Sequence, residues 1–358
     1  MIRFFAFIFL SLMIINPGAA WSQQRGNARS RQKAAGVGQP GPAAATGENL
    51  DYREEMRKFI QSISEFSHKL RPDFAIIARG GLELLVKRDE EDETKTYPAR
   101  TYIQSINGIL VEGLNFGIPR IGMPPPDADK QKIKLNLVKQ AKDAGLKVLV
   151  LDYAKDKGLI DKAYRRNKAK GYVSFAAPTR IPDIATLPEY PRRPYDENAA
   201  SVLSLKDVRN FLVIGNSAAF GRQDEFSLKM KETNYDAIIV NVFHGRLPLG
   251  KRAVETLKYK GTGGKRMALA FMDIGTAASY RFYWKKNWRE GYPSWISAPV
   301  RGNPDKFNVE YWNPEWRKII TGNFDSYIYG IINQGFDGVV LSGLDTFKYF
   351  ETGENPVQ

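Results

Sequence analysis

Short, nearly continuous hydrophobic runs recur along the chain and alternate with amphipathic or irregular stretches. Runs that are apolar at almost every position are typical of parallel strands covered on both faces. Eight such strands separated by helical segments predict an α/β fold, a (β/α)8 barrel. A doubly wound open sheet is the alternative, although it usually needs fewer strands. The predicted strands are Phe74–Ala78, Gly108–Val111, Val148–Leu151, Tyr172–Ala176, Phe211–Ile214, Ala237–Val242, Met267–Met272 and Val339–Leu341.

Helix signals occupy the intervals between the predicted strands. Asp51 and Glu54 have the spacing of a helix N-cap and its reciprocal acidic partner, and apolar residues then recur at helical spacing. Further helices are predicted over 131–143 and 313–335, the second because a proline opens it and a glycine ends it. The proline-rich stretch 179–204 predicts a long loop over one end of the barrel.

The N-terminal region has the pattern of an export signal. Arg3 precedes an apolar run over 4–15, and small residues follow, so residues 1–22 are predicted to be a signal peptide. The run is short for a membrane span, which leaves an uncleaved anchor as the lesser alternative. Residues 23–50 contain almost no large apolar side chain and predict a disordered linker. We therefore expect a secreted or periplasmic protein with one barrel domain over 51–358.

Composition excludes several kinds of site. The 358 residues include no cysteine and only two histidines, His68 and His244. Disulfides, thiolate metal sites and multi-histidine metal centres are therefore excluded. The glycine-rich segment 261–265 looks like a phosphate-binding loop, but it precedes a predicted strand, whereas a P-loop follows one, so it is interpreted as a turn. We expect neither a metal nor a cofactor.

The chain is strongly basic. Its formal net charge is +14, and residues 1–50 contribute +4 of this (five Lys or Arg against one Glu), which leaves +10 on the rest. Such an excess favours anionic polymers or surfaces as partners, although general solubility explains it too. Nucleic acid is not expected, because no binding motif is present. A basic interaction module that docks on an acidic envelope polymer is therefore one alternative for the function.

Acidic side chains follow several predicted strands, at the end of a barrel where active sites form. Glu112, Asp152, Asp273 and Asp345 all occupy such positions. A pair of carboxylates is the machinery of glycosidic bond hydrolysis, in which one acid protonates the leaving oxygen and the other attacks or activates water. The ordinary structural alternative is that acids at strand ends cap the next helix or pair with an arginine.

Aromatic residues crowd the window between the last two predicted strands, which contains five of the six tryptophans. Flat, rigid rings with polar edges suit the apolar faces of sugars or the surface of a partner. The alternative is a long connection that needs a small core of its own, since tryptophan is highly buried on average. The residues in this window are Trp284, Trp288, Trp295, Trp312 and Trp316, with Tyr280, Phe282, Tyr283, Tyr292, Phe307 and Tyr311.

From about Asp51 to Glu351 the chain resembles glycoside hydrolase family 114, a group of barrel proteins associated with endo-α-1,4-polygalactosaminidase activity. The stretches that carry the resemblance run in family order and cover most of the predicted folded part. They are YREEMRKFIQSIS from Tyr52, KDAGLKVLVLDY ending at Tyr153, KGYVSFAA from Lys170, NYDAIIVNVF from Asn234, SYRFYW from Ser279, VEYWNPEW from Val309 and GFDGVVLSGLD from Gly335.

The chain departs from this family at several acidic positions. Where the family typically reads Ile-Gly-Glu-Ala-Glu, residues 274–278 read Ile-Gly-Thr-Ala-Ala. Asn241 and Ser342 stand where the family has acids near the ends of two strands, whereas Asp152 and Asp345 match the pattern. The loss of one essential acid or base commonly lowers a rate by a factor of about 10² to 10⁴.

The resemblance implies a protein that acts on a polysaccharide by paired carboxylates, and the predicted signal peptide implies that it is exported. Asp152 and Asp345 are then the first catalytic candidates, with Glu112 and Asp273 in reserve. The alternative is a catalytically degenerate carbohydrate-binding protein on the same barrel. A galactosamine polymer without acetyl groups is cationic and would be repelled by this barrel, so the ligand is acetylated, neutral or acidic, or the chemistry has diverged. The expected sugar-positioning residues are Asn241, Arg281, Tyr283, Trp284 and Ser342.

Overall fold

The computed structural model describes residues 50–89, 91–92 and 95–354. The predicted signal peptide, and all of the predicted linker except Leu50, lie outside the described residues. No helix in the described part of the chain is long and apolar enough to cross a membrane.

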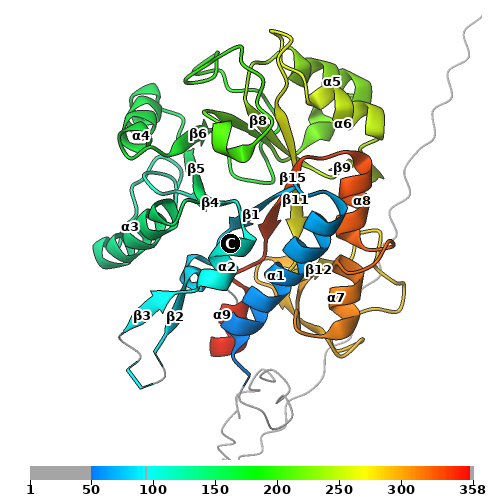
Figure 1. Ribbon diagram of the computed structural model, residues 1–358. Coiled ribbons are helices and arrows are strands. Elements are labelled where there is room, and N and C mark those ends of the chain that lie inside the picture. Colours follow the sequence, from blue (N-terminus) through cyan, green and yellow to red (C-terminus); the bar gives the residue numbers. More distant parts are fainter. Residues whose placement is uncertain (1–49, 90, 93–94, 355–358) are drawn as a thin grey trace, which may run out of the picture. The chain divides into compact units, whose positions relative to one another are not determined.

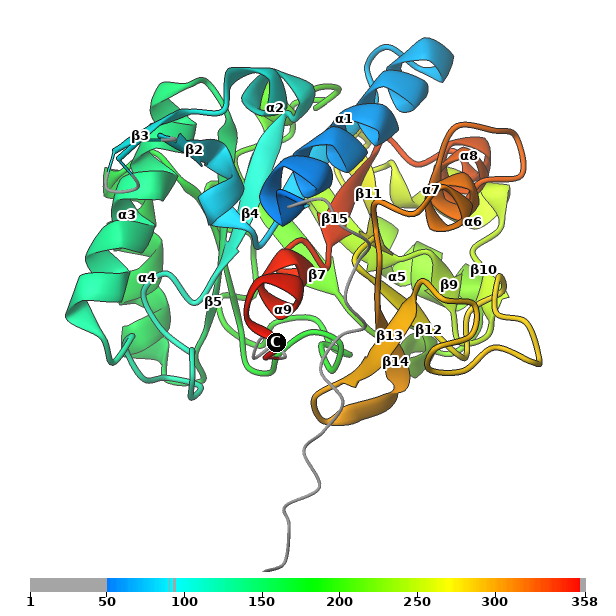
Figure 2. The ribbon, with the colours of Figure 1, turned by 90° about the horizontal axis from the view of Figure 1, so that it is seen from below.

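Eight parallel strands form the centre of the described chain, in the order β6-β5-β4-β1-β15-β11-β8-β7. Neighbouring strands follow chain order, and the first strand also pairs with the last, so the sheet curls into a nearly closed, TIM-barrel-like structure (Figure 1, Figure 2). All eight predicted strands are confirmed, whereas the doubly wound alternative is wrong, because its strand order would reverse direction. The barrel strands are β1 (Ala75–Arg79), β4 (Gly108–Glu112), β5 (Lys147–Tyr153), β6 (Val173–Ala177), β7 (Phe211–Ile214), β8 (Ala237–Asn241), β11 (Met267–Asp273) and β15 (Gly338–Ser342).

The barrel has one seam, between β6 and β7, which stand at the two ends of the hydrogen-bonded sheet. Side-chain packing spans this seam, since the rings of Phe175 and Phe211 lie 5.7 Å apart, centroid to centroid. The interior thus remains filled where the ladder is interrupted.

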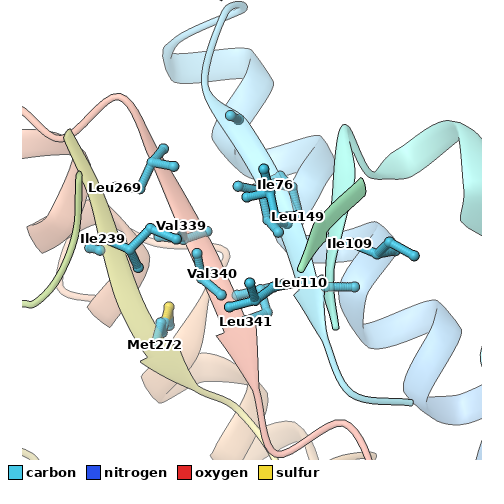
Figure 3. Packing of buried hydrophobic residues seen from close by; sticks show 14 of the residues in the cluster. Ile76, Ile109, Leu110, Leu149, Ile239, Leu269, Met272, Val339, Val340 and Leu341 are labelled. Atoms are coloured by element: carbon cyan, nitrogen blue, oxygen red, sulfur yellow. The ribbon is translucent and has the colours of Figure 1, made fainter. Parts of the chain in front are cut away.

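Apolar side chains from the barrel strands pack into one continuous core (Figure 3). Ile76, Leu149, Ile239, Leu269 and Val340 come from five different strands and are all fully buried. Each such side chain contributes about 1.5–3 kcal/mol relative to an exposed position, so the core fixes the strands that carry the polar residues at their ends.

Helices cover the outside of the barrel (Figure 1, Figure 2). The α-helices are α1 (Tyr52–Leu70), α2 (Arg100–Ser105), α3 (Ala128–Asp143), α4 (Lys157–Ala169), α5 (Gln223–Lys231), α6 (Lys251–Leu257), α7 (Pro314–Ile320), α8 (Tyr327–Gln334) and α9 (Thr346–Thr352). Three short 3-10 helices are η1 (Leu82–Leu85), η2 (Leu205–Asp207) and η3 (Ser217–Phe220). The minor strands are β2 (Val86–Arg88), β3 (Thr96–Pro98), β9 (Phe243–His244), β10 (Leu247–Pro248), β12 (Thr276–Ala278), β13 (Ile296–Val300) and β14 (Asn303–Val309).

The helix starts follow the sequence signals, but one helix is interrupted. Asp51 caps α1 by accepting a hydrogen bond from the backbone N–H of Glu54 at 2.9 Å, while the Glu54 carboxylate pairs with Arg57. The single helix predicted over 313–335 is wrong, because it is divided into α7 and α8. The chain leaves the helical conformation after α7, where Gly322 adopts a φ of 89° that favours glycine.

The long connection before β7 takes the place of a crossover helix. Residues 178–204 contain neither helix nor strand, as predicted. Near its start, the carbonyl of Ile184 accepts a hydrogen bond from the N–H of Gly215 at 2.9 Å, beyond the C-terminal end of β7. Near its end, the side chain of Asn198 donates to Asp236, just before β8 starts, at 3.1 Å. The loop therefore runs along the side of the barrel. The expectation that it lies over one end is wrong.

A fully buried ion pair secures the N-terminal end of the barrel. Lys260 Nζ lies 2.5 Å from Asp236 Oδ1, and both side chains have no exposed surface. The carboxylate also accepts hydrogen bonds from Asn198 Nδ2 and the Arg209 N–H, and the ammonium group donates to the carbonyl of Ala200 at 2.8 Å. Buried charges are tolerated only when they are paired and hydrogen-bonded in this way.

Removing the cation of this pair is expected to destabilise the fold strongly. Lys260→Met leaves the Asp236 carboxylate buried without its partner, which should lower the free energy of unfolding by about 3–5 kcal/mol in urea denaturation. Lys229→Met is the matched control, because its pair with Glu232 is exposed, and it should cost less than about 1 kcal/mol. Equal effects of the two variants would contradict the structural role of the buried pair.

Candidate ligand-binding site at the barrel mouth

Four of the polar residues at the strand ends face the same side of the sheet. Asp273 is paired in register with Ser342, and Phe271, two residues earlier on β11, is paired with Asn241. Paired residues of neighbouring strands, and residues two apart on one strand, point to the same face. The guanidinium of Arg79 lies 5.8 Å from the ring centroid of Phe271, on this same face.

Asp152 faces the opposite side and is buried completely. Its Oδ1 accepts hydrogen bonds from the backbone N–H groups of Asn115 and Phe116 at 2.7 and 3.0 Å. Its Oδ2 accepts from the side-chain amides of Asn115 and Asn167 at 2.9 and 3.1 Å. Because Asn167 belongs to α4, this face is the outside of the barrel, and the structure does not bring Asp152 to the mouth. The next residue, Tyr153, points inward instead.

The centre of the mouth is a network of Arg79, Glu112 and Tyr153. Glu112 forms an ion pair with Arg79 through Oε1 and accepts a hydrogen bond from the hydroxyl of Tyr153 through Oε2. Burial alone would raise the pKa of Glu112, but the attraction and hydrogen bonds of these partners outweigh it and lower the pKa. Burial and the adjacent carboxylate raise the pKa of Tyr153. Glu112 is therefore held as a carboxylate and Tyr153 as a neutral hydroxyl donor.

A second ion pair lies at the end of β11. Lys306 Nζ is 2.9 Å from Asp273 Oδ2, and the N–H of Thr276 donates to Asp273 Oδ1 at 3.0 Å. Burial opposes the charge of Asp273, but Lys306 outweighs it, so the pKa of this carboxyl is lowered. Asp273 also contributes to the raised pKa of Arg79, so the two ion pairs are close enough to interact.

Asp345 lies on the loop after β15 and braces two neighbouring segments. Its Oδ2 accepts a hydrogen bond from the N–H of Gly81 at 3.0 Å, and its Oδ1 lies 2.7 Å from Lys348 Nζ. A side chain at Gly80 would place its Cβ 2.3 Å from Asp345 Oδ2, so this approach requires glycine there. The carboxylate is partly exposed and is paired with a cation, like the other two.

The predicted sugar-positioning residues Asn241, Arg281 and Ser342 lie at the rim, with modest hydrogen bonding among themselves. Asn241 Oδ1 accepts from the N–H of Phe243 at 3.2 Å and from Arg281 Nη1 at 3.5 Å. The hydroxyl of Ser342 donates to the carbonyl of Met272 at 3.5 Å. Contacts of 3.5 Å are at the long limit of hydrogen bonding and hold these side chains only weakly.

Most of the aromatic window forms a small core of its own. Tyr283 packs edge-on against Trp316 at 5.4 Å, and Trp284 stacks on Phe307 at 5.3 Å. The hydroxyl of Tyr283 accepts a hydrogen bond from the N–H of Ala278, and burial raises its pKa. Tyr283 and Trp284 are thus mainly packing residues. The exposed rings of this window are Tyr280, 63% exposed, Phe282, 58% exposed, and Tyr292, 49% exposed.

Three residues that lie near the mouth were not selected from the sequence, namely Tyr153, Lys306 and Arg180. Tyr153 follows Asp152 directly, and the alternation of side chains along β5 would have favoured it over Asp152. Lys306 comes from β14, in a three-stranded antiparallel sheet inserted after β11. Arg180 comes from the loop after β6, and its guanidinium lies 5.9 Å from the ring centroid of Tyr153. Residues of an inserted sheet or a long loop, such as Lys306 and Arg180, cannot be placed by counting the barrel strands.

The mouth therefore offers hydrogen-bond donors, paired carboxylates and exposed rings. Within residues 50–89, 91–92 and 95–354, no three His, Asp or Glu side chains are grouped so that they could hold a metal ion. Paired charges and amides of this kind can bind hydroxyl groups in fixed directions.

Comparison with known proteins gives relatives over part of the chain. No protein-family model matches it. The chain is 34% identical over 122 residues to an uncharacterized protein of Methanocaldococcus jannaschii, which is 34% of either chain. It is 28% identical over 128 residues to an uncharacterized protein of Thermotoga maritima, covering 36% of this chain and 38% of that one. It is 37% identical over 83 residues to an uncharacterized protein of Deinococcus radiodurans, covering 23% of this chain and 26% of that one. The chain thus spans less than half the length of these curated relatives, whose names state no activity.

Proposed function

We propose that this chain binds a carbohydrate at the mouth of its barrel and does not cleave it. Hydrolysis of a glycosidic bond needs one protonated carboxyl group to donate to the leaving oxygen. Glu112 and Asp273 are the inward-facing carboxylates at the strand ends, and each is paired with a cation that lowers its pKa. The pairing of both carboxylates with cations is the observation that carries the proposal, because it stabilises their ionised forms and leaves neither of them as a proton donor at neutral pH.

The groups around the two ion pairs support sugar binding. Asn241 is partly exposed and supplies a neutral amide, and Tyr280 and Phe282 are exposed aromatic residues of the kind that contact sugars. The proposal also agrees with the resemblance to glycoside hydrolase family 114, from which several acids have been lost. On that resemblance we further propose a single (β/α)8 domain that is exported by the signal peptide predicted over residues 1–22.

Hydrolysis remains a second candidate function, with a changed pair of acids. Glu112 and Asp273 both raise the pKa of Arg79, so they flank one guanidinium at the mouth. A substrate that displaced Arg79 or Lys306 would raise the pKa of the carboxyl it released. The pair that carries hydrolysis in this case is Glu112 with Asp273, instead of Asp152 with Asp345.

Binding and hydrolysis can be separated with one panel of neutral, acidic and amino-sugar oligosaccharides. We expect calorimetric binding of at least one oligosaccharide, without release of new reducing ends. Replacing both Tyr280 and Phe282 with Ala should weaken this binding by about tenfold or more, because the stacking faces are lost. Leu203→Ala removes an equally exposed apolar side chain near the other end of the barrel and should leave the affinity unchanged.

Two outcomes of that experiment would contradict the proposal. Absence of binding to every member of the panel, by a protein that is folded, would exclude carbohydrate binding of these classes. New reducing ends that disappear in both Glu112→Gln and Asp273→Asn would establish the second candidate instead.

Asp152 is expected to matter for stability and not for binding. Asp152→Asn replaces an acceptor oxygen with an amide that faces the donors of Asn115 and Asn167, which should lower the free energy of unfolding by about 2–4 kcal/mol. The affinity for the oligosaccharide should stay within about twofold, because the side chain faces the outside of the barrel. Asp143→Asn, in an exposed pair with Lys139, is the control for stability. Lost binding at unchanged stability would place Asp152 in the site.

The two mouth carboxylates should also shape the dependence of stability on pH. Their pKa values in the folded protein lie below the ordinary values of 4.5 for Glu112 and 3.8 for Asp273. Their contribution is thus present above those values and is lost as the pH falls through the lowered pKa values. Glu112→Gln and Asp273→Asn should therefore lose less stability than the parent between about pH 5 and pH 2 in chemical denaturation. Identical pH profiles would contradict the lowered pKa values.

A further inference from the structure

Two arginines near the mouth have no carboxylate partner among the residues that the structure describes. Arg281 donates to Asn241 Oδ1 at 3.5 Å, which is the long limit of a hydrogen bond, and its other side-chain donors have no acceptor in the described part. Arg180 donates through Nη2 to the carbonyls of Gly117, at 2.7 Å, and Pro119. Both side chains are partly exposed.

The mouth carboxylates, by contrast, are already neutralised. Glu112 is paired with Arg79, Asp273 with Lys306, and Asp345 with Lys348. Lys348 is shared, since it also lies 2.8 Å from Glu83 Oε1. None of these carboxylates lies within ion-pair distance of Arg180 or Arg281.

Arg281 is held in a fixed orientation. Its guanidinium lies 5.1 Å from the ring centroid of Phe243 and 5.5 Å from that of Tyr280. Contacts with ring faces leave the edge of the guanidinium, which carries the N–H donors, directed away from the rings. A planar group prepared in this way can bind a carboxylate through two parallel hydrogen bonds, with little loss of side-chain freedom.

Arg180 and Arg281 lie at different parts of the rim. Arg180 follows β6 and packs against Tyr153 at the end of β5. Arg281 contacts Asn241 at the end of β8, and β7 lies between these strands in chain order. Positive charge is therefore available at two places, as suits a ligand with charges repeated along its length.

We propose that the carbohydrate bound at this mouth is acidic, an oligosaccharide of uronic acids whose carboxylates are bound by Arg281 and Arg180. The inference rests on the proposed carbohydrate binding and adds the charge of the sugar. A cationic amino-sugar chain would meet unpaired arginines and be repelled, while a neutral chain would leave their donors without charged acceptors.

The test compares three oligosaccharides of equal length with the full-length chain, by isothermal titration calorimetry at low salt. The probes are an oligomer of galacturonic acid, the same oligomer with its carboxyl groups reduced to alcohols, and an oligomer of glucosamine. We expect the galacturonic acid oligomer to bind at least about tenfold more tightly than the reduced one, and the glucosamine oligomer to bind most weakly. This preference should shrink as the salt concentration rises to about 1 M, where charges are screened within about 3 Å.

Variants of Arg281 locate the preference within the molecule. Arg281→Gln should weaken binding of the galacturonic acid oligomer about tenfold or more and change binding of the reduced oligomer by less than about twofold. The affinity of Arg281→Lys for the galacturonic acid oligomer should lie between those of the parent and of Arg281→Gln, since lysine keeps the charge but not the two parallel donors. Arg209→Gln removes the same charge from an exposed side chain at the other end of the barrel and should leave the preference intact.

The results distinguish failure of this inference from failure of the proposed function. Equal or tighter binding of the reduced or the glucosamine oligomer would overturn the acidic ligand while leaving carbohydrate binding in place. A preference for the acidic oligomer that persists in Arg281→Gln, or that is lost equally in Arg209→Gln, would overturn the role of Arg281 and attribute the preference to general charge. No binding of any of the three oligomers would contradict both.

Discussion

The alternation of side chains along each strand of the barrel decides which polar residues reach its mouth. At the end of β5, Tyr153 faces the interior and donates a hydrogen bond to Glu112, whereas its neighbour Asp152 faces the outer helices. A shift of one position would exchange these roles. The packed interior of the barrel holds this choice in place, because reversing it would bring apolar residues of the same strand to the wrong face.

Electrostatic pairing then decides what the inward-facing carboxylates can do. Glu112 and Asp273 lie in a partly buried site, where an unpaired carboxyl would have a raised pKa and could act as an acid. Arg79 and Lys306 reverse that effect, so both carboxyls stay ionised. A barrel mouth built in this way disfavours proton transfer from these two carboxyls, and this is the physical basis on which we propose binding instead of hydrolysis.

The sequence predicted the fold better than the site. Continuous apolar runs located all eight barrel strands, because a strand buried on both faces leaves a local pattern. Glu112 and Asp273, the reserve candidates chosen because each ends a strand, do face the interior of the barrel. Asp152 was placed by proximity to a strand end, which ignores alternation. Lys306 and Arg180 arrive from an inserted sheet and a long loop, and no local pattern records where such segments pack.

Most of the aromatic window follows one of the two alternatives that the sequence left open, a small core of its own. Trp295 and Trp316 are buried, and the indole of Trp316 donates to the carbonyl of Ile274 at 2.8 Å, directly after β11. This hydrogen bond anchors the inserted segment, which contains Arg281 and Lys306, to the barrel. Tyr280 and Phe282 remain exposed beside them. A rigid aromatic core beneath these rings would reduce the entropy lost in the binding that we propose, because the exposed side chains are already held in place.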